Sequence, residues 1–139
     1  MDKKAFMLDF ISQRGLATIS TVDKNGKPEA AVIGFGQTEN LEIIFGTDNA
    51  SRKYQNIVAN PSVALVIGWD DSRTVQLEGV ARELTPDDLQ LVKDTYWRKT
   101  PAAEKYHDDK GERYFLVKPT WIRYTDLSKK PWEVIELTF

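Results

Sequence analysis

Apolar and polar residues alternate along most of this chain, with a period that changes from helical to extended near residue 15. In residues 2–14 the apolar positions suit one side of a short amphipathic helix, and Gly15 is typical of a helix end. Residues 16–22 alternate and are rich in β-branched side chains, which predicts a strand. The pair Asn25-Gly26 is a strong hairpin signal, so we expect a returning strand over residues 28–36.

The middle of the chain predicts a strand, a short helix and a second strand in close succession. Residues 41–45 form the first of these strands, and a helix follows over residues 51–59. The helix should stop near Asn60, because Pro61 disfavours helical geometry in the residue before it. Residues 62–69 are almost continuously apolar, as in a buried strand.

The second half of the chain is predicted to be mostly extended, with one further helix. A long strand covers residues 74–84, and Gly79 marks a bulge or a close approach within it. Residues 85–88 have a hydroxyl cap, a proline and two acids, which is typical of a helix start, and the helix runs to about Arg98. A polar loop covers 99–111, and further strands are expected at 113–118, 120–126 and 132–138.

Seven or eight strands joined mostly by short turns predict a mainly β (α+β) fold with peripheral helices. A mixed or antiparallel barrel is favoured over a doubly wound sheet. At 139 residues, with 41% apolar residues, the chain is expected to form a single domain, residues 1–139.

Composition restricts the classes of function. A net charge of −2 argues against general nucleic-acid binding, which usually needs a basic face. The absence of cysteine excludes thiol catalysis and zinc–thiolate sites. There is no apolar run of membrane-spanning length and no signal-peptide pattern, so we expect no membrane partner and a cytoplasmic protein.

The most informative candidate chemistry is the cluster Ser51-Arg52-Lys53 at the predicted helix start. The first amide groups of a helix lack partners within it and attract anions. Cations are unfavourable there by roughly 0.3–1 kcal/mol each, so two of them indicate a bound phosphate, with Thr47 adding a further hydroxyl. The alternative is a solvent-exposed helix start whose two cations bind no ligand. Without a GxGxxG turn or a P-loop, any nucleotide is not held in a Rossmann or P-loop manner.

Three segments resemble one known family. They are FGTDNASRKYQNIVANP at residues 45–61, GKPEAAVIGFG at 26–36 and LEGVARELTP at 77–86. Over residues 16–127 the chain resembles the pyridoxamine 5′-phosphate oxidase-like family, the FMN-binding split barrels. This resemblance implies a split β-barrel and a homodimer with FMN at the interface between the two copies.

The resemblance also implies a set of cofactor-binding residues. The residues implied for the flavin phosphate are Gly46, Thr47, Ser51, Arg52 and Lys53. Those implied for the flavin ring are Ala31, Val32, Ile33 and Gly36, with Thr74 and Gln76 on a later strand. Oxidases that act on pyridoxamine phosphate carry an arginine and a lysine at the positions of Ala31 and Gly36. A family glutamine falls on Thr74, with Gln76 two residues away on the same face. These departures place the chain nearer the general-stress-protein-like members.

Three functional hypotheses remain open from the sequence. The first is an FMN-dependent oxidoreductase with an unknown small-molecule redox partner and no side chain that stands out as a catalytic acid or base. The second is a non-catalytic module of the same fold that binds flavin, a deazaflavin or haem. The third is an interaction protein without a cofactor. No metal site is predicted, and His107, the only histidine, reads as part of a solvated loop.

Overall fold

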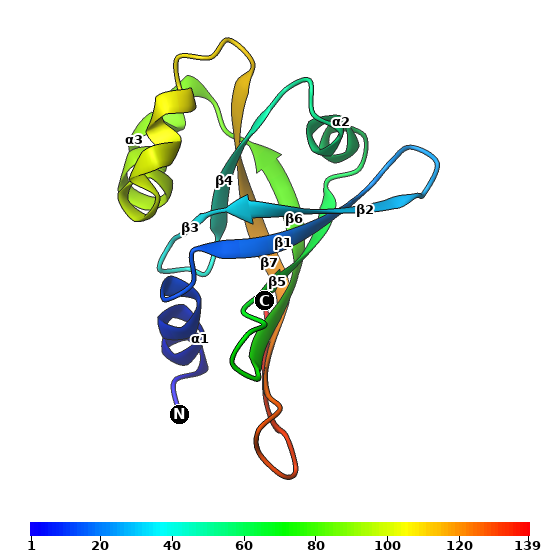
Figure 1. The fold of residues 1–139 in the computed structure, drawn as a ribbon, viewed down its shortest axis with the longest axis vertical. Coiled ribbons are helices and arrows are strands. Elements are labelled where there is room, and N and C mark those ends of the chain that lie inside the picture. The colour runs from blue at the N-terminus through cyan, green and yellow to red at the C-terminus, as the bar shows by residue number, and fades with distance from the viewer.

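A computed structural model describes residues 1–139, and its eight strands form one sheet (Figure 1). The strands are β1 (Leu16–Val22), β2 (Pro28–Gly34), β3 (Gly36–Gln37), β4 (Ile43–Asp48), β5 (Ser62–Ile67), β6 (Arg73–Glu83), β7 (Glu112–Asp126) and β8 (Glu133–Thr138). The helices are α1 (Lys3–Ser12), α2 (Arg52–Ala59) and α3 (Leu89–Val92), with 3₁₀ segments η1 (Pro86–Asp88) and η3 (Pro101–Tyr106) and a π-helical segment η2 (Lys93–Trp97).

All strand pairs are antiparallel, in the order β2-β1-β5-β6-β7-β4-β3, with β8 added beside β7. The sheet curls strongly, and this is the split β-barrel that the sequence predicts. The predicted bulge is present, because the pairing of β6 with β7 shifts between Glu78 and Gly79. A Cβ on Gly79 would lie 2.5 Å from the carbonyl oxygen of Lys118, so the close approach of the two backbones requires glycine.

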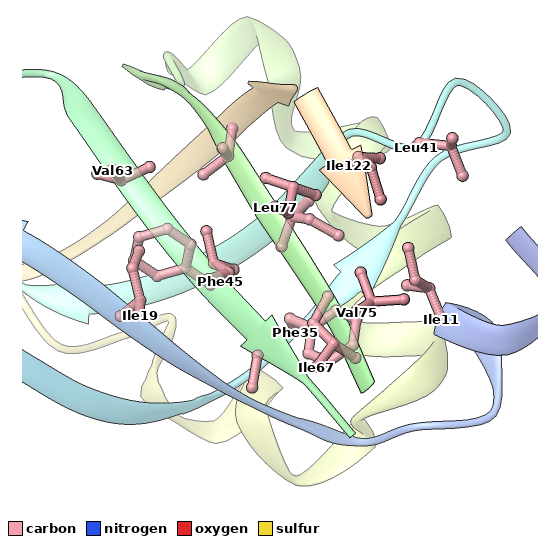
Figure 2. Packing of buried hydrophobic residues seen from close by; sticks show 14 of the residues in the cluster. Ile11, Ile19, Phe35, Leu41, Phe45, Val63, Ile67, Val75, Leu77 and Ile122 are labelled. Atoms are coloured by element: carbon pink, nitrogen blue, oxygen red, sulfur yellow. The ribbon is translucent and has the colours of Figure 1, made fainter. Parts of the chain in front are cut away.

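The barrel interior is filled by a cluster of 22 buried apolar residues (Figure 2). In β6 the buried positions alternate with exposed ones, so that Val75 and Leu77 point inward and Gln76 points out. Phe45 and Phe115 face each other from the paired strands β4 and β7, with ring centroids 5.6 Å apart. A second, smaller cluster lies on the other side of these two strands, beneath α3 and η2.

Local sequence explains the helix boundaries. Asp2 caps α1 by accepting a hydrogen bond from the Ala5 amide at 3.0 Å, and Ser51 caps α2 in the same way through the Tyr54 amide at 3.1 Å. The β1–β2 hairpin turns where expected, with Gly26 at φ +82°. No helix of the structure has the length and apolar character needed to cross a bilayer.

Several predicted boundaries were wrong for reasons that lie outside the local sequence. The strand expected over 28–36 breaks at Phe35, whose side chain is fully buried, and Gly36 pairs with β4 instead. The strand expected from Leu41 begins at Ile43, because Leu41 has φ +66° in the preceding turn. The strands expected at 113–118 and 120–126 are one strand, β7, and the predicted loop 99–111 contains η3.

Candidate functional site

A groove of about 500 Å³ lies between the β1–β2 hairpin and the first residues of α2. Figure 1 shows α2 beside this hairpin. The groove is lined by residues of three elements and of the turns that flank them: Ile19, Thr21, Lys27, Glu29, Ala30, Ala31, Ser51, Arg52 and Lys53. The start of α2, the predicted phosphate site, therefore lies next to β2, the strand predicted to hold the flavin ring.

Polar donors converge at the start of α2. The Oγ of Ser51 lies 2.9 Å from the Oγ1 of Thr47, whose side chain is buried at the end of β4. The Nζ of Lys53 donates to the same Thr47 hydroxyl at 3.4 Å. The amide N–H groups of Arg52 and Lys53 have no acceptor in the chain, as expected for the first turn of a helix. This end of the helix therefore has free donors and two cations together.

A carboxylate on the opposite side of the groove pairs with one of these cations. Glu29 on β2 forms an ion pair with Arg52, and its other oxygen accepts a hydrogen bond from Asn56 Nδ2 at 3.0 Å. The same Asn56 nitrogen donates to the Thr21 hydroxyl at 3.0 Å. Asn56 is buried, so the pair of bonds links α2 to the two strands of the hairpin.

The electrostatics of the groove favour anions. Lys27, Arg52 and Lys53 contribute three cations against the single carboxylate of Glu29. Burial lowers the pKa of Lys53, and the nearby Glu112 carboxylate opposes that shift. Burial raises the pKa of Glu112, and Asp109 and Asp48 raise it further. An anion beside Lys53 would compensate for the cost of burying its charge.

The residues of β2 divide between two faces, because side chains alternate along a strand. Ala31 is exposed and lines the groove, and Val32 is 61% exposed on the opposite face of the sheet. Ile33 belongs to the barrel core. Only Ala31 of these three therefore presents a side chain to the groove.

Three further candidates lie outside the groove. A Cβ on Gly36 would lie 2.5 Å from backbone atoms of Thr95 and Tyr96, so this glycine allows η2 to pack against β3. Thr74 and Gln76 lie on the outer face of the sheet. Cross-strand pairing places Val32, Thr18, Val66 and Gln76 in one row across β2, β1, β5 and β6 on that face.

Gly46 has a structural role that the sequence does not reveal. A Cβ there would lie 3.2 Å from the Tyr114 ring and 3.3 Å from a carboxylate oxygen of Glu112, so its small size lets these side chains pack over β4. Gly46 does not line the groove, although it directly precedes Thr47.

Sequence reasoning missed Lys27, Glu29 and Asn56. The first two follow the Asn-Gly turn and are typical of an ordinary solvated hairpin. Asn56 lies in the middle of a short helix, with no local sign of its partners. A second cavity, of about 430 Å³, lies between α3 and β7 and shares no lining residue with the groove. His107 lines it and hydrogen-bonds to the Tyr114 hydroxyl at 3.0 Å.

The chain is thus a split β-barrel with two cations and unpaired amide groups at the start of a helix, beside strand β2. A family model described as pyridoxamine 5′-phosphate oxidase matches residues 4–126. The chain belongs to this family, as the resemblance in the sequence predicts.

Two curated relatives show the extent of the similarity. The pyridoxine/pyridoxamine 5′-phosphate oxidase of Bordetella avium is 30% identical over 89 residues, covering 63% of this chain and 40% of that protein. The corresponding protein of Pseudomonas fluorescens is 28% identical over 120 residues, covering 78% of this chain and 54% of that protein. The chain thus spans about half the length of these relatives or less.

Solved structures share the fold at low sequence identity. A haem-binding protein from Mycobacterium smegmatis has a TM-score of 0.83 at 17% identity, covering 97% of this chain and 57% of that chain. A pyridoxamine 5′-phosphate oxidase-related, FMN-binding protein from Nostoc punctiforme has a TM-score of 0.72 at 16% identity, covering 97% and 93%. General Stress Protein 26 from Bacillus anthracis has a TM-score of 0.71 at 24% identity, covering 99% and 100%.

Proposed function

We propose that this chain is an FMN-binding flavoprotein that serves as an oxidoreductase, with the flavin phosphate held at the start of α2. The observation that carries the proposal is that Ser51, Arg52 and Lys53 line one groove, while Thr47 directly behind them bonds to Ser51 and Lys53. Membership of the pyridoxamine 5′-phosphate oxidase family supports it, as does the FMN-binding description of the Nostoc punctiforme protein.

The donor set fits a phosphate monoester. Arginine offers a fork of donors to two phosphate oxygens, and lysine offers a point charge. The unpaired amide groups at the start of α2 and the Ser51 hydroxyl would complete the set. The arginine and lysine bring two positive charges to a group that carries nearly two negative charges at neutral pH.

The second strand offers a floor for the ring. Ala30 and Ala31 line the groove with small side chains, so a planar group can approach the β2 backbone closely. When bound, FMN supplies hydride and electron transfer through its ring. The groove residues would bind and orient the ligand. None of them stands out as a general acid or base, which suits chemistry carried by the flavin ring.

We propose that a second copy of the chain covers the outer sheet face. Four large apolar side chains are exposed there: Leu16, Val32, Val66 and Val80. The row that contains Val32 and Val66 also contains Gln76, so the same pairing would bring the partner's Gln76 and Thr74 against this outer face. Patches of this kind commonly mark protein interfaces.

Pyridoxamine phosphate is not the substrate that the site favours. The lysine carried by oxidases that act on this substrate falls on Gly36, and the backbone of η2 occupies the space into which any side chain at this position would extend. Another small redox partner is therefore the better proposal, and its identity must come from an assay of electron acceptors.

A non-catalytic binding module is the second candidate, favoured by the alanine and glycine at positions 31 and 36. Haem is the weaker ligand within it, because His107 bonds to Tyr114 beside the other cavity and does not line the groove. Photoreduced FMN on this protein should pass electrons to oxygen or a quinone faster than free FMN does if the chain is an oxidoreductase. An equal rate would favour the module.

The test of flavin binding is an equilibrium titration followed by flavin fluorescence and visible absorption. Arg52→Ala combined with Lys53→Ala should weaken FMN binding by one to several powers of ten, since each charge-assisted contact contributes roughly 1.5–3 kcal/mol. Lys129→Ala combined with Lys130→Ala is the matched control, because it removes two exposed cations at the β7–β8 turn. Equal FMN affinity in the Arg52/Lys53 variant and the wild type would refute the phosphate assignment.

A further inference from the structure

Glu29 is the only carboxylate among the residues that line the groove. Its side chain is 19% exposed, although it comes from a hairpin strand whose neighbouring residues are exposed. One carboxylate oxygen pairs with the Arg52 guanidinium, and the other accepts from Asn56. The groove therefore already contains an anion, and it belongs to the chain.

The network fixes the carboxylate more firmly than the cation. Asn56 is buried and donates through one amide nitrogen to both Glu29 and Thr21, which holds the far side of the carboxylate in place. The Arg52 side chain is 76% exposed, so it can turn away from Glu29 toward an incoming anion. A competing anion would therefore draw Arg52 off a carboxylate that stays where it is.

We propose that Glu29 is an internal counterion of the phosphate site, which competes with the ligand phosphate for Arg52 and limits the affinity of the groove for FMN. The proposal rests on the assignment of the groove to flavin phosphate. A ligand phosphate must draw Arg52 away from the ion pair and also tolerate a fixed negative charge beside it. Glu29 thereby weakens the phosphate contribution to binding and keeps FMN exchangeable.

A purely structural role for Glu29 would give a different signature. If its only task were to tie the hairpin to α2, then Glu29→Gln would change the binding of any flavin, with or without a phosphate. A glutamine keeps the size of the side chain and an oxygen that can accept from Asn56, so it removes the charge and little else.

The experiment compares FMN with riboflavin, which has the same ring and no phosphate, by equilibrium fluorescence titration. We expect Glu29→Gln to tighten FMN binding by about tenfold, the size of effect expected from one neighbouring charge at a half-exposed site, and to leave riboflavin unchanged. Glu39→Gln, which removes an exposed carboxylate at the β3–β4 turn, should change neither. In an Arg52→Gln background, the gain from Glu29→Gln should shrink, because the competition acts through Arg52.

The outcomes separate this inference from the proposed function. Unchanged or weaker FMN binding by Glu29→Gln, with wild-type protein that binds FMN, overturns the inference and assigns Glu29 to orienting Arg52. An equal change for FMN and riboflavin also overturns it. If neither protein binds FMN, the proposed function fails, and inorganic phosphate then decides the inference. Phosphate must raise the melting temperature of Glu29→Gln more than that of the wild type, and equal shifts reject it.

Discussion

Gly36→Ala tests whether the helical segment, rather than a ligand, requires glycine at this position. A Cβ at residue 36 would lie 2.5 Å from the carbonyl carbon of Thr95, 2.5 Å from the amide nitrogen of Tyr96 and 2.6 Å from the Thr95 oxygen. All three are backbone atoms, so no side chain can turn away to relieve the overlap. The strand and η2 must instead separate.

The structure sets the size of the effect. Overpacking a well-packed contact costs typically 1–3 kcal/mol, and the upper end applies where backbone must shift. Separation would also loosen the smaller buried cluster, in which Tyr96 and Trp97 pack against Ile44 of β4. At about 3 °C per kcal/mol for a chain of this length, the melting temperature should fall by about 3–9 °C.

Urea and thermal unfolding, followed by far-ultraviolet circular dichroism, measure this loss. Gly15→Ala is the matched control, because a Cβ there meets nothing within 4 Å, and it should leave stability within about 0.5 kcal/mol of the wild type. FMN affinity should change little in folded Gly36→Ala. Full stability in this variant would refute the packing argument, and a selective loss of FMN binding would return Gly36 to the cofactor site.

Three further predictions address pH, assembly and capping. Lys99 is half-buried and donates to the Ile11 carbonyl at 3.2 Å, and burial lowers its pKa to about 8 from an ordinary 10.5. Above pH 8 the unfolded chain therefore binds more protons than the folded chain. The free energy of unfolding should rise from about pH 8 toward 9.5 as a result. Lys99→Met should flatten that rise in urea unfolding curves, and an unchanged rise would exclude Lys99 as its source. Val66→Asp should convert a dimer to a monomer in light scattering and weaken FMN binding, whereas a wild-type monomer would reject the proposed interface. Ser51→Ala should cost about 0.5–2 kcal/mol in unfolding free energy through loss of the α2 cap, and a loss below 0.3 kcal/mol would contradict the capping role.

The hairpin and α2 could be predicted from the sequence because their signals act over only a few residues. The Asn25-Gly26 turn, the cap at Ser51 and the stop before Pro61 each depend on backbone geometry that the residues themselves impose, and the hairpin and α2 were predicted within a residue or two. The break at Phe35 depends on contacts far away in sequence, because the next residue, Gly36, pairs with Ile44 of β4 and lies against the backbone of η2. No pattern within residues 28–36 carries that information.

The residues of the candidate site also differ in how much the local sequence reveals about them. Arg52 and Lys53 could be predicted as candidates from the sequence, because two cations at a helix start conflict with the helix dipole unless an anion is bound there. Gly36 carried no such conflict, and its place in the motif suggested a ligand where the structure has the backbone of η2. A glycine alone does not indicate whether the close neighbour is a ligand or another part of the chain.

Glu29 changes the set of charges at the predicted phosphate site from the one that the sequence indicates. From the sequence, the predicted phosphate site has the cations Arg52 and Lys53 and no carboxylate assigned to it. In the folded chain, the hairpin brings a carboxylate from 23 residues earlier in the chain against Arg52, and a buried asparagine holds it there. The affinity for a phosphate then depends on a difference between two anions rather than on the cations alone. The Ser51-Arg52-Lys53 cluster of this chain therefore does not set the affinity for phosphate by itself, because the carboxylate opposite Arg52 contributes to it as well.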